Sequence, residues 1–352
     1  MPENTTPKTV RSYQDNPVGF VVVGLGKGAN LAETITRTPG VRLVGVCDLI
    51  EERARRVSDA LSVPYELDAR RFLDNPEVEV VYVVTPTGRH LEVAELAMSA
   101  GKHVLVTKPM EASLEASTRM IRLAEGAGVL LGVDFQRRFR TETVTLKAAV
   151  EKKAFGRLLS GMDAHRAYRP AEYFRESGGW RGTKRWDGGG VMSNQAVHDI
   201  DEIAYTVGIP ARVRCDVWTQ DHDIEAEDLA ISTWAYSSGL VFNFYATTAY
   251  PGTWGNPRLE LHGTEGAYYA ESGGRFKKPL RQWYLHGEWN DTPPEVVPSE
   301  WLNAADNYAA AVRTGAHLTC DGRDGRRTQS ILDALYRSAY SGGPWVDVAP
   351  DL

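Results

Sequence analysis

Two residues with ionisable side chains lie where they could carry out acid–base chemistry. Lys108 ends the apolar run HVLVTKP (103–109), and a lysine at the end of a buried strand is costly unless its ammonium group is paired or used. His198 lies within DGGGVMSNQAVHDID (187–201), after a run of three glycines. Because an unperturbed imidazole titrates near neutral pH, His198 could accept and return a proton.

The residues around His198 have helical spacing. Asn194, His198 and Asp201 are at positions i, i+4 and i+7, and so share one face of a predicted helix over 191–208. A metal site made from His198 and Asp201 is conceivable, but one histidine with one carboxylate is a small ligand set. We therefore predict no metal.

A glycine-rich turn, GLGKGA (Gly24–Ala29), follows the apolar run FVVVG and fits the pattern G-x-G-x-x-G/A. In a chain with 33 glycines a bare G-x-G is weak, so the context matters: strand, turn, helix, second strand and then Asp48. This order is typical of a dinucleotide site, in which the turn and the helix N-terminus hold a pyrophosphate. Asp48 is placed to bind a ribose diol, which favours NAD over NADP, although it could instead only cap the next helix.

Further cofactor contacts are expected at the carboxyl ends of the strands, where ligands bind in open α/β folds. The segment VVTPTGRH (83–90) supplies Thr85, Pro86 and His90 there, although a histidine at such a place is more often only the first residue of a helix. The expected cofactor-binding residues are Gly24, Leu25, Gly26, Lys27, Gly28, Ala29, Asp48, Thr85, Pro86, His90, Thr107, Lys108, Trp180 and Arg181.

The first part of the chain has the pattern of a doubly wound parallel sheet. Between residues 20 and 133, short β-branched runs alternate with helical stretches, which predicts βαβ units with helices on both faces. We expect residues 1–16 to form a flexible leader and residues 17–138 to form an NAD-binding Rossmann domain.

Residues 139–352 have a different pattern. Alternating strands over 211–271, joined by short turns such as SSG and GTEG, predict an open-faced and largely antiparallel sheet within an α+β domain. Helices are expected before and after these strands. We predict that this domain binds the substrate and carries the contacts between subunits, and its C-terminal helix could pack back on the first domain.

Composition and charge exclude several classes of protein. The 42% of hydrophobic and 24% of charged residues are average for a globular chain. A net charge of −6 argues against a nucleic-acid partner, and no run approaches the ~18 apolar residues that cross a membrane. Three separated cysteines without a C-x-x-C pair fit neither a disulfide framework nor a zinc site, so we expect a cytoplasmic protein.

From about residue 18 to 348 the chain resembles the Gfo/Idh/MocA family of oxidoreductases. The specific motifs are the family's E-K-P, here Thr107-Lys108-Pro109, and its GGGxxxDxGxHxxD, here Gly188–Asp201. QRRF (136–139), Trp180-Arg181 and the C-terminal DGRDGRRTQSILDALYRSA are also similar to the family. The resemblance implies a Rossmann domain fused to an open-faced α/β domain. It also implies hydride transfer between NAD and a secondary hydroxyl or ketone of a sugar, sugar derivative or inositol-like cyclic polyol.

Three positions depart from the family motifs: Thr107 replaces a glutamate, Asn194 an aspartate and Ala196 a glycine. Sugar and polyol dehydrogenases of the family use the lysine, aspartate and histidine as one unit, so the resemblance implies that Lys108, Asn194 and His198 are the catalytic residues. An asparagine can hydrogen-bond a hydroxyl or fix an orientation, but it cannot stabilise an imidazolium as a carboxylate would. The expected substrate-binding residues are Arg137, Tyr168, Asn194 and His198.

Two other functions fit the same residues. NAD could oxidise a sugar transiently to permit elimination, so that the net reaction is that of a lyase or glycosidase. Alternatively, the replacements at Thr107 and Asn194 could leave a non-catalytic NAD-binding regulator.

The expected partners are a small sugar or polyol and further copies of the same chain. Family members oligomerise through the C-terminal sheet, so the resemblance implies a homodimer or homotetramer. Candidates for an apolar sheet face are Trp218, Trp234, Phe242 and Phe244.

Overall fold

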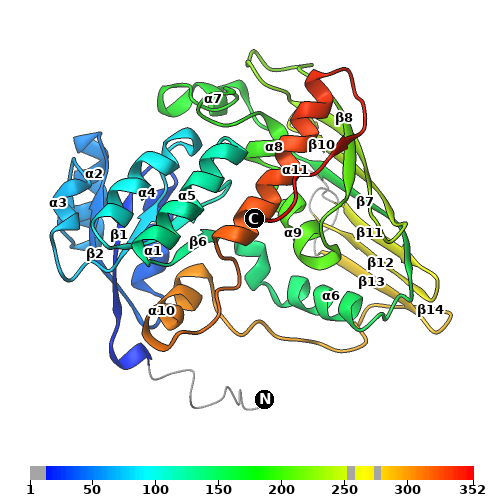
Figure 1. The fold of residues 1–352 in the computed structure, drawn as a ribbon, viewed down its shortest axis with the longest axis horizontal. Helices are drawn as coiled ribbons and strands as arrows, with labels where there is room; N and C mark the ends of the chain where they lie inside the picture. The colour runs from blue at the N-terminus through cyan, green and yellow to red at the C-terminus, as the bar shows by residue number, and fades with distance from the viewer. Residues whose placement is uncertain (1–12, 252–257, 273–278) are drawn as a thin grey trace. The chain divides into compact units, whose positions relative to one another are not determined.

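The computed structural model describes residues 13–251, 258–272 and 279–352 of the chain (Figure 1). These residues form two compact units. Unit 1 takes those up to Glu111, with Glu115–Phe139 and Glu300–Gly325; unit 2 takes those within Ala112–Leu114, Arg140–Ser299 and Arg326–Leu352. The predicted change of domain after residue 138 lies beside the change after Phe139, but residues 300–325 belong to unit 1. The assignment of one unit to the cofactor and the other to the substrate stays a prediction.

Unit 1 is built around a six-stranded parallel sheet with strand order β3-β2-β1-β4-β5-β6. The strands are β1 (Val18–Val23), β2 (Val41–Cys47), β3 (Tyr65–Glu66), β4 (Val80–Val83), β5 (His103–Thr107) and β6 (Leu131–Asp134). The helices between them are α1 (Gly28–Thr36), α2 (Glu51–Leu61), α3 (Arg70–Leu73), α4 (His90–Ser99) and α5 (Leu114–Ala127). Every residue of β1 and β4 is buried, as expected where both faces of a sheet are covered. The order reverses between β1 and β4, and this confirms the predicted doubly wound sheet.

Helix α10 (Ala304–Thr314) explains why residues 300–325 belong to unit 1. Five of its first eight residues are alanines, so the helix can approach the core of the sheet closely. Tyr308 lies among them, with its ring centroid 6.4 Å from that of Phe20. Its hydroxyl lies 2.8 Å from the carbonyl oxygen of Val104 and 2.7 Å from that of Leu130.

The predicted leader is wrong at its C-terminal end. Residues 1–12 lie outside the described part of the chain, whereas Tyr13 is buried in the core of unit 1. Its hydroxyl donates a hydrogen bond to the carboxylate of Asp306, and its ring lies 6.4 Å from that of Trp301. A buried aromatic side chain with a hydrogen-bonded hydroxyl fixes this part of the chain to α10.

Unit 2 contains a nine-stranded sheet with the order β14-β13-β12-β11-β7-β10-β9-β8-β15. The strands are β7 (Leu158–Arg166), β8 (Arg212–Trp218), β9 (Leu229–Ala235), β10 (Val241–Thr247), β11 (Arg258–Gly263), β12 (Gly266–Glu271), β13 (Leu280–Leu285), β14 (Glu288–Asn290) and β15 (Val346–Asp347). Its helices are α6 (Thr141–Glu151), α7 (Ala171–Arg175), α8 (Val191–Asn194), α9 (Val197–Val207) and most of α11 (Gly322–Tyr340). Of the strand pairs, β7 with β10 is parallel and the others are antiparallel, so the sheet is mixed and largely antiparallel as predicted.

Two local predictions in unit 2 are wrong. The central strand β7 was not predicted, because LLSGMDAHR mixes apolar, small and charged residues without a clean alternation. The predicted helix over 191–208 is interrupted between Asn194 and Val197, where the amide of Ala196 donates to the carbonyl oxygen of Val191 at 2.8 Å. Asn194 therefore ends α8 and His198 lies in the first turn of α9, so they do not share one continuous helix face.

The residues predicted to form an apolar exposed face of the large sheet lie mostly on its buried face. Trp234, Phe242 and Phe244 are fully buried and stack on one another, so three of the four candidates for an exposed face belong to the core. The remaining candidate, Trp218, is 41% exposed. Helices α8, α9 and α11 lie to one side of this sheet (Figure 1). Large apolar side chains that are exposed on its strands are Leu159, Trp218, Ile231, Val241, Tyr284 and Trp289.

The helices were also compared with the length and hydropathy that a membrane-spanning helix requires. In the part of the chain that the structure describes, no helix combines the length and the hydrophobicity needed to cross a bilayer.

Candidate active site

The glycine turn of unit 1 joins β1 to α1. Gly24 has φ +95°, and a Cβ there would lie 2.7 Å from backbone atoms of Val84 and Thr85, so only glycine fits. A Cβ on Gly26 would meet nothing within 4 Å. Gly28 starts α1, and a Cβ there would lie 3.3 Å from Val22 and Val84, so the helix approaches these strand residues closely at Gly28.

The start of α1 fits an anion. The residue that caps it, Lys27, makes no side-chain hydrogen bond to the first turn, so the amide groups there have no side-chain cap. The open space beside Gly26 lies directly before these amides. Uncapped amides at a helix N-terminus together with open backbone are what a pyrophosphate requires. These residues therefore fit the dinucleotide that the turn predicts.

Asp48 directly follows β2 and is 7% exposed. Its Oδ2 accepts a hydrogen bond from the amide of Leu25 at 2.7 Å, which ties the glycine turn to the second strand. Its Oδ1 accepts from the amide of Ile50 at 2.9 Å. The residue that caps α2 is Ile50, so the alternative in which Asp48 is the N-cap of the next helix is wrong. The guanidinium of Arg53 lies 3.2 Å from Oδ2. Sequence reasoning did not find Arg53, nor the exposed Leu49 that follows Asp48.

His90 is the first residue of α4 and is completely buried. Its Nδ1 lies 3.1 Å from the carbonyl oxygen of Pro109, and its Nε2 lies 3.0 Å from that of Thr85. Burial lowers the pKa of this imidazole, although the carbonyl groups oppose the shift. Because backbone encloses both ring nitrogens, the prediction that the His90 side chain contacts the cofactor is wrong. The alternative of a helix-start residue is right, and the ring joins the backbone after β4 to the backbone after Lys108.

Thr85 and Pro86 lie half-buried after β4, beside the glycine turn. The Oγ1 of Thr85 is buried, and no residue in the described ranges hydrogen-bonds it. A buried hydroxyl of this kind costs free energy, which a ligand that reaches it would recover.

Lys108 follows β5 and is half-buried. Asp134, at the end of the neighbouring strand β6, is the register partner of Thr107, the residue before Lys108. Asp134 is 4% exposed and accepts a hydrogen bond from the hydroxyl of Tyr82. Burial raises the pKa of Asp134, and the positive charge of Lys108 opposes this. Asp134 was not predicted, although it is a charged residue at the end of an apolar strand, which is the property that singled out Lys108.

The three glycines before α8 let other groups approach the backbone. A Cβ on Gly190 would lie 1.8 Å from the carbonyl oxygen of Glu227, and one on Gly189 would lie 1.8 Å from the hydroxyl of Tyr336. The Glu227 carboxylate, itself buried, accepts hydrogen bonds from the amides of Gly190 and Met192 and from Tyr336, at 2.9–3.0 Å. Burial raises the pKa of Glu227 to about 7. Glu227 holds the start of α8 in place and was not predicted.

Asn194 and His198 lie on either side of the break between α8 and α9. Asn194 is 9% exposed, and its amide nitrogen donates to both carboxylate oxygens of Asp187, at 2.7 and 2.8 Å. His198 is half-buried. The next residue, Asp199, lies 2.7 Å from Nδ1 of His165 on β7. The Nε2 of His165 is buried and has no hydrogen-bond partner among the described residues. His165 is therefore a further candidate site residue, and it was not predicted because the strand that carries it, β7, was not predicted.

The remaining residues expected to contact the cofactor or the substrate differ in how deeply they are buried. Arg181 is buried, and its guanidinium stacks 4.6 Å from the Tyr173 ring centroid and 5.0 Å from that of Trp180. Tyr168 is 38% exposed in unit 2. Arg137 is half-buried in a short helix, Gln136–Phe139, of unit 1.

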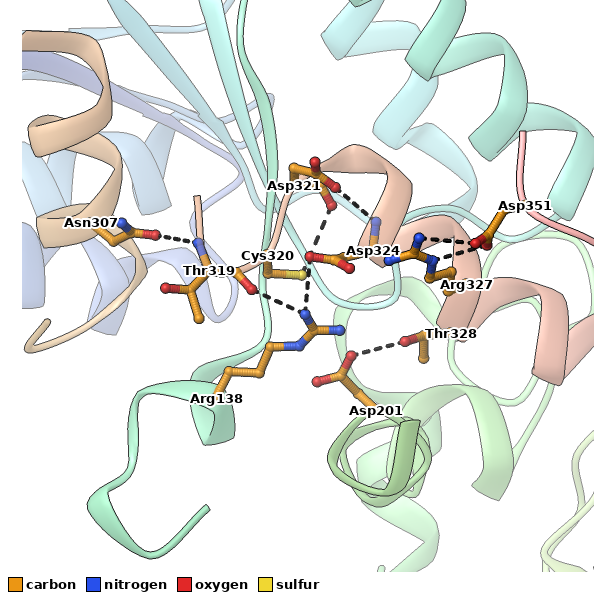
Figure 2. Close-up of polar contacts among 10 residues, drawn as sticks. All are labelled: Arg138, Asp201, Asn307, Thr319, Cys320, Asp321, Asp324, Arg327, Thr328 and Asp351. Carbon is orange, nitrogen blue, oxygen red and sulfur yellow. Dashed lines mark hydrogen bonds and ion pairs between the residues drawn. The ribbon is translucent and has the colours of Figure 1, made fainter. Parts of the chain in front are cut away.

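Two other motif residues are structural. Figure 2 shows that in unit 1 the guanidinium of Arg138 donates to the carbonyl oxygen of Thr319 at 3.0 Å and lies 3.2 Å from Asp324. Within unit 2, Thr328 donates to the buried carboxylate of Asp201 at 2.8 Å (Figure 2). Asp201 therefore joins α9 to α11.

The sequence matches known families along most of its length. The model of an oxidoreductase family with an NAD-binding Rossmann fold, GFO/IDH/MocA, matches residues 18–135, and that of a GFO/IDH/MocA C-terminal domain matches residues 143–269. A scyllo-inositol 2-dehydrogenase (NADP⁺) of Bacillus subtilis is 27% identical over 82% of this chain and 84% of its own. A 1,5-anhydro-D-fructose reductase of Ensifer adhaerens is 30% identical over 77% of this chain and 80% of its own.

A solved structure gives the same result. The WlbA dehydrogenase from Bordetella pertussis, in complex with NADH and UDP-GlcNAcA, has a TM-score of 0.85 and 26% sequence identity, and the match covers 96% of this chain and 100% of that one. Two family models that together match well over half of the chain and a fold that agrees throughout lead to one conclusion. The chain belongs to the Gfo/Idh/MocA family of oxidoreductases, whose first domain is an NAD-binding Rossmann fold.

Proposed function

We propose that this oxidoreductase transfers a hydride between NAD and a secondary hydroxyl or ketone of a sugar, a sugar derivative or an inositol-like cyclic polyol. The observation that carries the cofactor is the glycine turn, with open space at Gly26 before uncapped amides of α1. The substrate class is supported by the names of the relatives, which include an inositol dehydrogenase and an anhydro-sugar reductase.

The proposed roles divide between the two catalytic side chains. When bound, the nicotinamide supplies the group that takes or gives the hydride. His198 takes the proton of the substrate hydroxyl as the carbinol carbon is oxidised and returns it in the reverse direction. Lys108 donates a hydrogen bond to that oxygen and stabilises its developing negative charge. Asn194 holds an orientation in this proposal, and Arg137 and Tyr168 are proposed substrate contacts.

A panel of polyols, hexoses, uronates and anhydro-sugars tests this function, with the change in NADH absorbance as the readout. We expect turnover with at least one member. Products of elimination, with tightly bound cofactor that never exchanges, would instead support the lyase-like reaction. NADH binding without turnover of any compound would support a regulator and contradict the proposal.

Cofactor preference is expected to follow the charges at the end of β2. NADH should bind at least about tenfold more tightly than NADPH, because a 2′-phosphate would meet the Asp48 carboxylate. Arg53, 3.2 Å from that carboxylate, is the cation that would receive the phosphate. Arg53→Ala should therefore weaken NADPH more than NADH, as measured by fluorescence titration with both cofactors. Equal binding of the two by the unchanged protein would contradict the NAD preference.

We also propose a homodimer or homotetramer formed through the large sheet of unit 2. The exposed apolar side chains on its strands are the observation in favour, and Ile231 on the inner strand β9 is 48% exposed. Light scattering at micromolar concentration should report an oligomer, and Ile231→Glu should dissociate it. The matched control is Leu302→Glu, since Leu302 is 68% exposed in unit 1. A monomeric mass for the unchanged protein would overturn this proposal.

The proposed location is the cytoplasm. Cys47, Cys215 and Cys320 are all buried free thiols, which suits a reducing compartment.

A further inference from the structure

The side chain of Asn194 is held from both ends. Its amide nitrogen donates to Asp187 and lies 2.7 and 2.8 Å from the two carboxylate oxygens. Its Oδ1 accepts hydrogen bonds from the hydroxyl of Tyr173 at 2.6 Å and from Nε2 of Gln195 at 2.5 Å. An amide oxygen has two lone pairs, so the contacts with Tyr173 and Gln195 use its full acceptor capacity, while the amide nitrogen is directed at Asp187. The side chain of Asn194 is therefore held in a network through both its oxygen and its nitrogen.

Asp187 is the charged member of this network. It is 1% exposed, and besides the hydrogen bond from Asn194 it accepts the amide hydrogen of Gly182 at 2.8 Å. Hydrogen bonds from these two nitrogen groups to a buried side chain stabilise its carboxylate form. Its negative charge also contributes to raising the pKa of the Tyr173 hydroxyl, for which burial is the main cause. A buried negative charge thus lies directly behind the amide of Asn194.

The neighbouring groups tie this pair to the start of α9. Gln195, which contacts Asn194 Oδ1, also donates to the hydroxyl of Tyr173 at 2.8 Å and accepts a hydrogen bond from Arg169. Two guanidinium groups, those of Arg169 and Arg181, lie over the Tyr173 ring at 5.3 and 4.6 Å. Gln195 is in the break between α8 and α9, three residues before His198. The orientation of the Asn194 amide therefore determines the hydrogen bonds of the segment that leads into the helix of His198.

We propose that Asp187 is a positioning residue for the reaction, acting through Asn194. The carboxylate that residue 194 lacks is present at residue 187, one hydrogen bond away, so the site keeps its negative charge. Asp187 also fixes which end of the Asn194 amide faces Tyr173 and Gln195. The inference rests on the proposed function, because its consequence is measured as turnover.

The test is an exchange of the two residues. Asp187→Asn removes the charge and lets the facing amides turn, and Asn194→Asp sets two buried carboxylates against each other. Each change should lower kcat by about 10- to 100-fold, the size of a hydrogen bond to a charged group. The double variant Asp187→Asn with Asn194→Asp restores one carboxylate and one amide at the same contact. It should recover kcat to within about threefold of the unchanged protein, while Kd for NADH stays constant in all three variants.

A control separates positioning from loss of stability. Asp306→Asn removes another buried carboxylate, one that accepts from Tyr13 and Leu302 in unit 1. It should lower Tm without lowering kcat of the folded protein. Losses in the double variant that equal the product of the two single losses would overturn the pairing, as would full kcat in Asp187→Asn. If the unchanged protein turns over nothing, the proposed function fails, and the same exchange followed by Tm still decides the pairing: an additive loss of Tm would reject it.

Discussion

Replacing His198 by alanine is expected to lower kcat by at least about 10²-fold, because the hydroxyl proton then has no positioned acceptor. Replacing Lys108 by alanine should cost a similar factor, since the substrate oxygen loses the cation that stabilises its developing charge. Kd for NADH should stay within about twofold in both variants, because both leave the glycine turn and the Asp48 contact intact. Lys108 is also an expected cofactor contact, but it is one of many. Stopped-flow measurement of NADH formation gives kcat, and fluorescence titration gives Kd.

The matched control is His317→Ala. This histidine is exposed in unit 1, and its carbonyl oxygen accepts a hydrogen bond from Asn307 at 2.9 Å, which the substitution leaves in place. Its replacement should leave kcat unchanged. Full activity in either His198→Ala or Lys108→Ala would remove that residue from the mechanism.

The Rossmann sheet could be predicted from the sequence because its signals are local. Apart from β3 (Tyr65–Glu66), which was not predicted, the strands of unit 1 are short apolar runs, and the glycine turn lies directly after β1. The break after Asn194 could not be predicted in this way. The contacts of the residues at the break are tertiary: Asn194 donates to Asp187, and Gln195 donates to Tyr173, which is 22 residues away in the sequence.

The same reason explains which site residues were missed. Asp134 lies near the Lys108 segment only because strands β5 and β6 pair, which makes it the register partner of Thr107. His165 lies on a strand whose pattern gave no signal, and its partner Asp199 comes from a distant helix. His90 was misjudged for the opposite reason: its place in the sequence suits a ligand, but the fold encloses both ring nitrogens in backbone. Residue type and spacing therefore identify site residues within one local motif. They do not identify residues whose role depends on a partner that is distant in the sequence.

Adding one methyl group at Gly26 is expected to separate cofactor binding from folding. A Cβ there meets no atom within 4 Å, so Gly26→Ala should leave Tm unchanged or slightly raised, since it also reduces the freedom of the unfolded chain. If the pyrophosphate lies against this backbone, the methyl group occupies its place. Kd for NADH should then rise by about tenfold or more.

Gly24→Ala is the matched comparison two residues away in the same turn. With φ +95° the substitution costs roughly 1–2 kcal/mol in backbone conformation alone. The overlap at 2.7 Å with the backbone of Val84 and Thr85 adds to this, so Tm should fall by several degrees. The two variants therefore predict opposite signatures: weak NADH binding in a stable protein for Gly26→Ala, and loss of stability for Gly24→Ala. Unchanged Kd for NADH in Gly26→Ala would mean that the open space beside the turn is not where the cofactor binds, and the role assigned to the start of α1 would have to be abandoned.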